Sequence, residues 1–142
     1  MYKFTPIMFV VLAILLLAII TACGGTQAPQ TVPVPNGTYT NMVVIDVGPN
    51  STKTVPAELR LKDSVFEIVV LGGRSSLGGY ALTKNLMVFV GELNAGEFAC
   101  TEGQEVGVYT YKYAGQQLVL TRVDDPCLVR ELVLVQNAWV KK

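Results

Sequence analysis

The segment GVYTYKYAGQQLVLTRVDDPCLVR, residues 107–130, decides the fold. Two strand-like runs, Val106–Tyr113 and Leu118–Val123, flank the polar turn Ala114–Gln117, which predicts a β-hairpin. An Asp-Pro pair follows at positions 125 and 126 and is typical of a helical start, because Asp accepts hydrogen bonds from free N–H groups and Pro suits the first helical position. We therefore expect a hairpin and a short helical turn near residues 125–130, against which the other strands close.

Strand-like runs separated by turn residues extend on both sides of this segment, from Gly37 to the end of the chain. Ala57–Lys62 alternates most clearly, since its apolar and charged residues fall on opposite faces of a strand. The Gly-rich stretch Gly72–Gly79 is expected to be a flexible connection. The other expected strands are Thr38–Val47, Val65–Leu71, Tyr80–Thr83, Leu86–Glu92, Glu97–Thr101 and Glu131–Val140.

About eight strands joined by short turns predict an all-β domain with an antiparallel, up-and-down sheet. Closure of such a sheet into a barrel removes the unpaired edges that an open sheet would expose. The interior of an eight-stranded barrel is either filled by side chains or holds one small ligand. A β-sandwich remains the alternative, because periodicity does not separate the two architectures.

The N-terminus has the composition of an export signal. Ile7–Ile20 is a run of fourteen apolar residues, which suits a signal-peptide core and is shorter than the roughly 20 residues of a spanning helix. The box Ile20-Thr21-Ala22-Cys23 follows, and the whole resembles a bacterial lipoprotein signal. The resemblance implies cleavage before Cys23 and its acylation with palmitate-type chains, which anchor the protein to the extracytoplasmic side of an envelope membrane. An uncleaved signal anchor is the alternative.

This resemblance predicts three parts of the chain. Residues 1–22 are the signal peptide, residues 23–36 a flexible tether that contains Pro and Gly, and residues 37–142 the folded domain. With Cys23 acylated, Cys100 and Cys127 remain as an even pair in an oxidising compartment, which predicts a disulfide. The loop that it closes would add about 3–4 kcal/mol to the free energy of unfolding in the chain-entropy model.

The charges and the absence of histidine exclude several functions. The chain has 11 basic and 11 acidic residues and no His, so it offers no basic surface to follow the phosphate backbone of a nucleic acid. Catalytic triads that contain His and zinc sites that contain His are excluded as well. We expect a protein that is not an enzyme and that carries no cofactor and no metal.

Two groups of residues resemble the lipocalins, a calycin-type barrel family. Gly37-Thr38-Tyr39 resembles the Gly-x-Trp motif that opens the first lipocalin strand, with Tyr in place of Trp. The tail, from Gly107-x-Tyr109 through Asp125-Pro126-Cys127 and Arg130 to Trp139, resembles small lipocalin-like domains of bacterial lipoproteins. The resemblance implies that Arg130 packs over Tyr39 to close one barrel end, and that the barrel binds a small apolar molecule.

Four aromatic residues are candidates to line a cavity: Tyr80, Phe89, Tyr109 and Tyr111. The alternative is that they are plain core or a cross-strand packing ladder. Two functions follow. The first is a lipid-anchored lipocalin-like protein that binds a small hydrophobic ligand without catalysis. The second is a barrel with a filled core that acts as a structural or protein-interaction module of the cell envelope.

Overall fold

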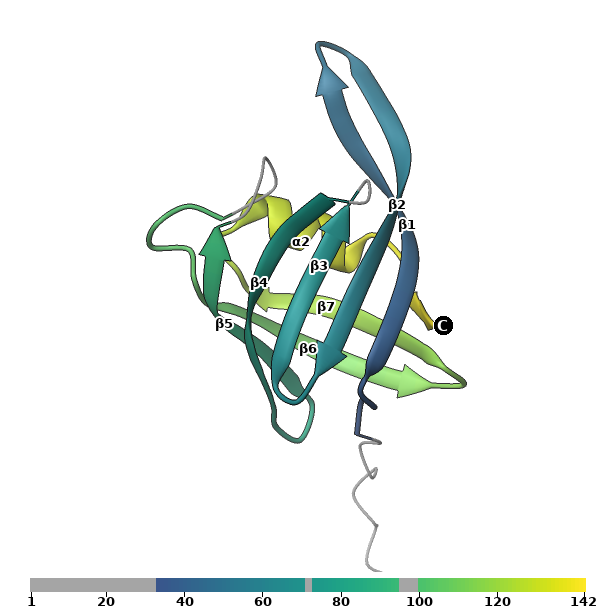
Figure 1. Ribbon diagram of the computed structural model, residues 1–142, viewed down its shortest axis with the longest axis vertical. Coiled ribbons are helices and arrows are strands. Elements are labelled where there is room, and N and C mark those ends of the chain that lie inside the picture. Colours follow the sequence, from purple (N-terminus) through teal and green to yellow (C-terminus); the bar gives the residue numbers. More distant parts are fainter. Residues whose placement is uncertain (1–32, 71–72, 95–99) are drawn as a thin grey trace, which may run out of the picture. The chain divides into compact units, whose positions relative to one another are not determined.

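The computed structural model describes residues 33–70, 73–94 and 100–142, all of which belong to one compact unit, Thr31–Lys142. Eight strands form a closed barrel in which every neighbouring pair is antiparallel, so the predicted all-β barrel is confirmed and the sandwich is excluded (Figure 1). Among the described residues, no helix is long and apolar enough to span a membrane. The predicted signal peptide and nearly all of the tether lie outside the described residues.

The strands follow the order of the chain around the barrel. They are β1 Gly37–Gly48, β2 Ser51–Lys62, β3 Val65–Val70, β4 Gly73–Leu82, β5 Leu86–Asn94, β6 Gly107–Ala114, β7 Gln117–Asp124 and β8 Trp139–Lys141, and helix α2 is Leu128–Val135. The predicted hairpin of residues 106–123 is the β6–β7 pair. Its turn residues Gly115 and Gln116 both have positive φ, at 55° and 69°, which is the backbone of the tight type I′ turns that join twisted strands.

Four expectations about the elements are wrong. Glu131–Val140 is expected as one strand, but α2 covers its first half and only its last two residues lie in a strand, β8. Helical spacing explains this, because Arg130, Val133 and Leu134 bury one face of α2 at positions i, i+3 and i+4. The Gly-rich stretch, expected as a flexible connection, is mostly strand and belongs to β4. The second strand, expected from Ala57, begins six residues earlier as β2. Cys100 and Thr101 lie outside any strand, and residues 97–99 lie outside the described part.

Alternating side chains fill the interior of the barrel. In β2, for example, Val55, Ala57, Leu59 and Leu61 are buried, whereas the residues between them face outward. At the centre, the ring of Phe89 meets Phe66 and Tyr109 edge to face, at centroid distances of 4.7 and 5.6 Å. Edge-to-face pairs at these distances are well packed aromatic contacts. This part of the interior is therefore occupied by side chains.

Hydrogen bonds and packing tie further segments to the barrel. At the base, where β1 begins, the Tyr39 hydroxyl donates to the Pro35 carbonyl at 2.6 Å, and the Tyr80 hydroxyl donates to Asn36 Oδ1 at 3.2 Å. Away from this base, α2 packs beside β7 and β1 (Figure 1) and buries Val133 and Leu134 in the core. The Trp139 Nε1–H donates to the Leu134 carbonyl at 3.0 Å and ties α2 to β8.

The barrel closes through a very short strand and two side-chain amides. β8 pairs with β1 only at Tyr39 and Thr40. Farther along β1, the Gln136 amide donates to the Val44 carbonyl at 2.9 Å and accepts from the Val44 N–H at 2.7 Å. The Asn137 amide donates to the Met42 carbonyl at 3.0 Å. These amides occupy the backbone groups that a longer β8 would otherwise pair.

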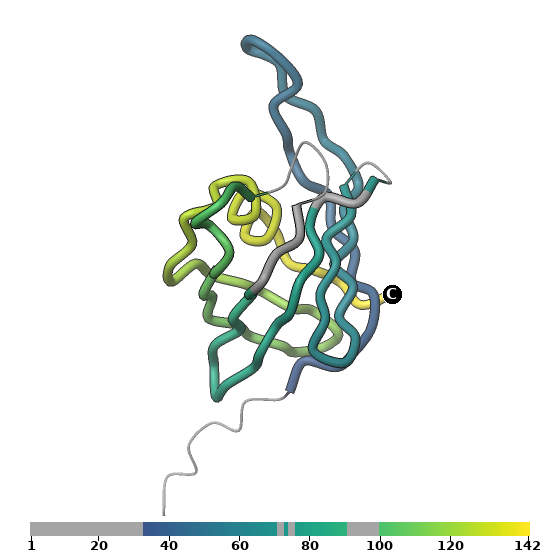
Figure 2. Tube along the Cα trace, turned by 60° about the vertical axis from the view of Figure 1, so that its left-hand side comes forward, coloured from purple at the N-terminus to yellow at the C-terminus, as the bar shows by residue number. Residues whose placement is uncertain are grey.

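Beyond this closure, residues 45–56 form a two-stranded arm. β2 pairs with β3 only over Ala57–Lys62, so the part of β2 before Ala57 pairs with β1 alone. Figures 1 and 2 show the β1–β2 hairpin projecting from the barrel at the end opposite to residue 33, where the described chain begins. We call residues 45–56 the arm.

The central aromatic contact can be tested by truncation. Phe89→Ala should lower the free energy of unfolding by about 3–5 kcal/mol, because it removes a fully buried ring from between two others. Urea denaturation would measure the change. Val119→Ala is the matched control, since Val119 is 42% exposed, and its effect should stay within about 0.5 kcal/mol. A Phe89→Ala protein as stable as the wild type would contradict the packed interior.

Candidate functional site

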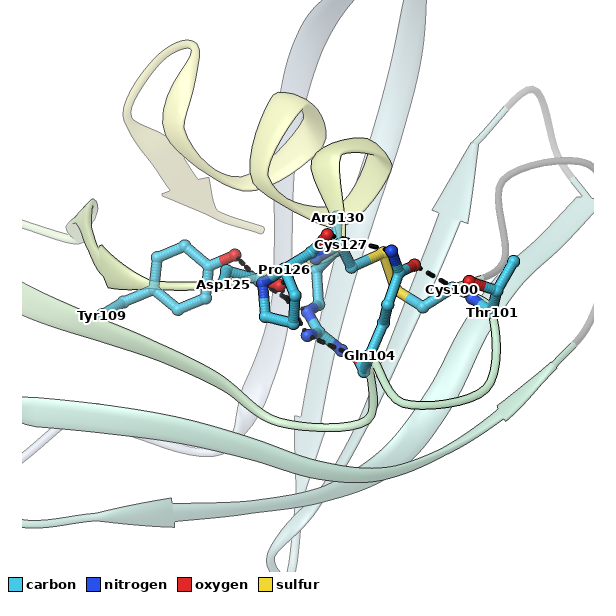
Figure 3. The surroundings of a disulfide bond; sticks show 8 residues. All are labelled: Cys100, Thr101, Gln104, Tyr109, Asp125, Pro126, Cys127 and Arg130. Carbon is cyan, nitrogen blue, oxygen red and sulfur yellow. Dashed lines mark hydrogen bonds and ion pairs between the residues drawn. A yellow bond between two sulfur atoms is a disulfide. The ribbon is translucent and has the colours of Figure 1, made fainter.

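A disulfide joins the loop before β6 to the start of α2, and a buried ion pair lies beside it. The Cys100 and Cys127 sulfurs are bonded, with a Cα–Cα distance of 5.5 Å, which confirms the predicted pair. Gln104 reinforces this connection, because its side chain accepts from the Thr101 N–H at 3.1 Å and donates to the Pro126 carbonyl at 3.0 Å. Figure 3 shows these residues around the disulfide.

The ion pair lies beside the disulfide and is entirely buried. Arg130 binds the Asp125 carboxylate through two nitrogens, Nε to Oδ2 and Nη2 to Oδ1, each at 2.7 Å. Both side chains have no solvent exposure. The Tyr109 hydroxyl also donates to Asp125, the Cys127 N–H donates to it at 2.8 Å, and Arg130 donates to the Gln104 carbonyl at 3.0 Å. Such two-point pairing, supported by further hydrogen bonds, is what a buried ion pair requires.

The helix begins two residues later than the Asp-Pro pair predicts, at Leu128 and not at Pro126. The N-cap residue of α2 is Cys127, and the helix begins at Leu128. Asp125 lies two residues before the cap, and it accepts the Cys127 N–H and the Arg130 guanidinium. The carboxylate therefore organises the turn into α2 through Arg130, in the first turn of the helix, as well as through a backbone N–H group.

Gly107 at the start of β6 makes room for this pair. A Cβ on Gly107 would lie 2.9 Å from both Nε and Nη2 of Arg130 and would overlap the Asp125 carboxylate. Neither group can move away, because each is held by several hydrogen bonds inside the protein. The Gly at this position is thus required by close packing.

The groups around Asp125 form a buried network of one ion pair and several hydrogen bonds. Asp125 receives donors from Arg130, Tyr109 and Cys127. Burial raises the pKa of Tyr109, and the hydrogen bond to Asp125 and its charge raise it further. Tyr109 therefore stays protonated and acts as a donor. No group of three His, Cys, Asp or Glu residues that could hold a metal occurs among the described residues.

The four candidate lining residues are buried in the barrel, a position that suits both a cavity lining and plain core. Tyr80, Phe89, Tyr109 and Tyr111 all belong to the buried core cluster. The hydroxyls of Tyr80 and Tyr109 are already bonded to protein atoms, and Phe89 lies between two aromatic rings. Contact with a ligand remains a prediction for these residues.

The expected pairing of Tyr39 with Arg130 is not what the structure shows. Tyr39 meets the ring of Tyr113 edge to face, with the centroids 6.3 Å apart. Arg130 instead packs against Gly107. Gly107 and Tyr113 are six positions apart on β6, which corresponds to roughly 20 Å along a strand. The two residues thus serve different ends of the barrel, and Asp125 takes the role of partner to Arg130.

Sequence reasoning missed one polar residue inside the barrel, Ser76. It lies in β4 opposite Ile68, a core residue, so the two side chains share the inner face. Ser76 is 2% exposed, and its hydroxyl has no hydrogen-bond partner among the described residues. The Gly-rich composition around it favoured a loop, which hid the inward alternation. The predicted lipidation site, Cys23, lies outside the described residues.

Two open grooves lie on the outer surface, on either side of Gln136 and Asn137. One, of about 550 Å³, runs over β1, β2 and β8 and includes Met42, Pro56 and Val140. The other, of about 370 Å³, follows α2 and includes Leu128 and Leu132. Both are formed mainly by apolar side chains, and Leu128 is 72% exposed.

No protein-family model, curated protein or solved structure matches this chain. Its function is therefore inferred from its own residues and their geometry.

The buried tyrosines predict a loss of stability at alkaline pH. The pKa values of Tyr109 and Tyr39 are raised, mainly by burial. Above about pH 10 the unfolded chain releases these protons and the folded chain retains them, so stability falls as pH rises, by up to about 1.4 kcal/mol per pH unit for each tyrosine.

Urea denaturation between pH 8 and 11 would measure this slope. Tyr109→Phe should reduce it, whereas Phe66→Leu, a core change without a titratable group, should keep the wild-type slope. An equal slope in the wild type and in Tyr109→Phe would contradict the assigned environment of Tyr109.

Proposed function

We propose that this chain is a lipid-anchored protein of a bacterial cell envelope, a non-catalytic module whose packed barrel presents its outer surface to protein partners. The observation that carries the proposal is the close packing of side chains in the described part of the barrel interior. An eight-stranded barrel is just wide enough for its own side chains to fill. The side chains in this interior include the Phe66–Phe89–Tyr109 contact, and Tyr39 and Leu134 belong to the same core cluster.

The outer surface supports a role in protein contacts. The two grooves bring apolar side chains to the surface, and Met42, Val44 and Val140 are 50%, 41% and 45% exposed. Val44 adjoins Met42 on the outer face of β1, and Val140 pairs with Thr40 on the same face. Contiguous exposed apolar surface marks interaction sites in many soluble domains. Single exposed valines would not require such an explanation.

The location rests on two independent features. Residues 7–23 resemble a lipoprotein signal, and the resemblance implies an acylated Cys23. The disulfide between Cys100 and Cys127 suits an oxidising compartment outside the cytoplasm. Both favour an anchored protein on the extracytoplasmic side of a membrane.

A second candidate function, the binding of a small apolar ligand, is favoured by Ser76. An unpaired hydroxyl among apolar core residues is unusual, because most buried polar atoms have a partner. A ligand with one hydrogen-bonding group and an apolar body would supply that partner. The resemblance to lipocalins favours the same function.

Mass spectrometry separates these two functions. Native spectra of the protein purified from its own host should contain the acylated chain without a further bound molecule, and denaturing extraction should release none. A copurifying apolar molecule would overturn the packed-barrel proposal. Loss of that molecule in Ser76→Ala, but not in the surface variant Thr121→Ala, would place it in the barrel and support ligand binding.

The anchor predicts acylation at one residue. The protein should incorporate labelled palmitate in a bacterial host, and Cys23→Ser should abolish the incorporation, because the thiol is the acceptor. Thr21→Ser, which keeps a small residue in the box, should remain labelled. A membrane-bound protein with a free thiol at Cys23 would show that the hydrophobic segment itself is the anchor.

A further inference from the structure

We propose that the free edge of β2 in the arm, Thr52–Pro56, binds an extended strand of another protein that carries an acidic side chain opposite Lys53. The inference rests on the proposed role as an interaction module and names its site and its type of partner. Strand addition of this kind uses backbone hydrogen bonds for affinity and the neighbouring side chains for specificity.

The two edges of the β1–β2 hairpin differ in whether their outward backbone groups are hydrogen-bonded. On the β1 side, the amides of Gln136 and Asn137 occupy the backbone groups of Val44 and Met42. On the β2 side, pairing with β3 ends at Ala57, and no described residue pairs with the outer side of Thr52–Pro56. The protein thus protects one edge with its own side chains and leaves the other open.

The register shows which groups the open edge offers. Val44 pairs with Thr54, and Met42 pairs with Pro56. The backbone groups of Val44 and Met42 point away from β2, toward Gln136 and Asn137. Directly opposite residues of an antiparallel pair either bond to each other or both point outward. Thr54, and Thr52 two residues earlier, therefore direct their N–H and C=O groups to the open side.

Pro56 suits this edge and limits its length. Its missing N–H would point outward, where it costs no hydrogen bond with β1, and proline in sheets is found at such edge positions. An added strand would use four backbone groups of Thr52 and Thr54 and the carbonyl of Pro56. The site thus fits a short extended segment.

Lys53 selects the chemistry of the partner. Its side chain is exposed, and it forms no ion pair with any described residue. It lies on the face opposite to Thr52 and Thr54, whereas Asp46 lies on their face because it pairs with Thr52. Opposite charges across neighbouring strands stabilise pairing and like charges destabilise it. An acidic residue opposite Lys53 therefore complements the edge.

A second copy of this chain fits the edge poorly. In a twofold antiparallel pairing centred on Lys53, the two lysines would lie directly opposite each other. Centred on Thr54, the pairing would bring Asn50 of the turn beside Glu58, whose outer side already pairs with Val69 of β3. Centred on Thr52, it would place Thr54 opposite the Asn50 turn. A strand from another protein avoids these conflicts.

The test uses two capped, fluorescein-labelled peptides, TVTETVT and TVTKTVT, and the full chain in detergent micelles. Fluorescence anisotropy should show about tenfold tighter binding of the Glu peptide than of the Lys peptide, because a favourable charge pair replaces an unfavourable one. Lys53→Glu should reverse the preference. Hydrogen exchange should show the Thr54 amide protected by the Glu peptide.

Thr54→Pro should abolish binding, since it removes an outward N–H in the way that Pro56 already does without breaking the β1 ladder. Thr54→Val, which keeps the N–H, should bind as the wild type does. If Thr54→Pro fails to fold, the charge reversal at Lys53 decides alone.

Equal binding of the two peptides, or a preference that Lys53→Glu leaves unchanged, would overturn the proposal. Self-association of the chain without peptide that is lost in Thr54→Pro would also overturn it, in favour of a second copy. A failure here leaves the packed-barrel function standing on the mass-spectrometry result, so the two failures are distinguishable.

Discussion

The buried ion pair between Asp125 and Arg130 is the interaction on which the rest of the barrel depends. It joins the end of β7 to the first turn of α2, and Tyr109 and Gln104 bring β6 and its preceding loop to the same point. Removing one partner of such a pair leaves a buried charge without compensation, at a cost of about 3–5 kcal/mol. The disulfide beside it joins Cys100, in the loop before β6, to Cys127 at the start of α2 by a covalent bond.

The position of α2 determines how the barrel closes. Once Arg130 is held, Val133 and Leu134 cover the interior, and Gln136 and Asn137 reach β1. Side-chain amides then replace the backbone of a longer strand, which allows β8 to be only three residues long. The same arrangement protects the β1 edge and leaves the β2 edge open. The asymmetry of the arm is thus a consequence of how the last strand is built.

The packed interior and the open edge favour an interaction module over a carrier. The lipocalin resemblance implies a ligand cavity, but three of the candidate lining residues, Tyr80, Phe89 and Tyr109, pack against other rings or donate hydrogen bonds to the protein. Ser76 differs from them, since its buried hydroxyl has no hydrogen-bond partner in the described part of the chain. A substitution of Ser76 therefore tests which of the two proposed functions holds.

Much of the architecture could be predicted from the sequence because it depends on local patterns. Alternation in Ala57–Lys62, the turn between β6 and β7, and the pairing of Cys100 with Cys127 were predicted correctly. Each depends on residue types at short spacing or on a count of cysteines. The inward positions of Phe89 and Tyr109 follow from the same period of two.

Other features were decided only by tertiary structure. Leu128–Val135 is rich in Leu and Val and fits a strand as well as a helix over eight residues. The burial of Arg130, Val133 and Leu134 on one face, with Arg130 against Asp125, selects the helix. The Gly-rich stretch joins the sheet because β3 and β5 pair with it on both sides.

The partner of Arg130, the closure by Gln136 and the free edge of β2 involve residues brought together from distant parts of the chain. The sequence by itself determined which segments are strands that bury one face. Only the folded barrel decided which edges meet, because hydrogen bonds between distant segments leave no periodic pattern along the chain.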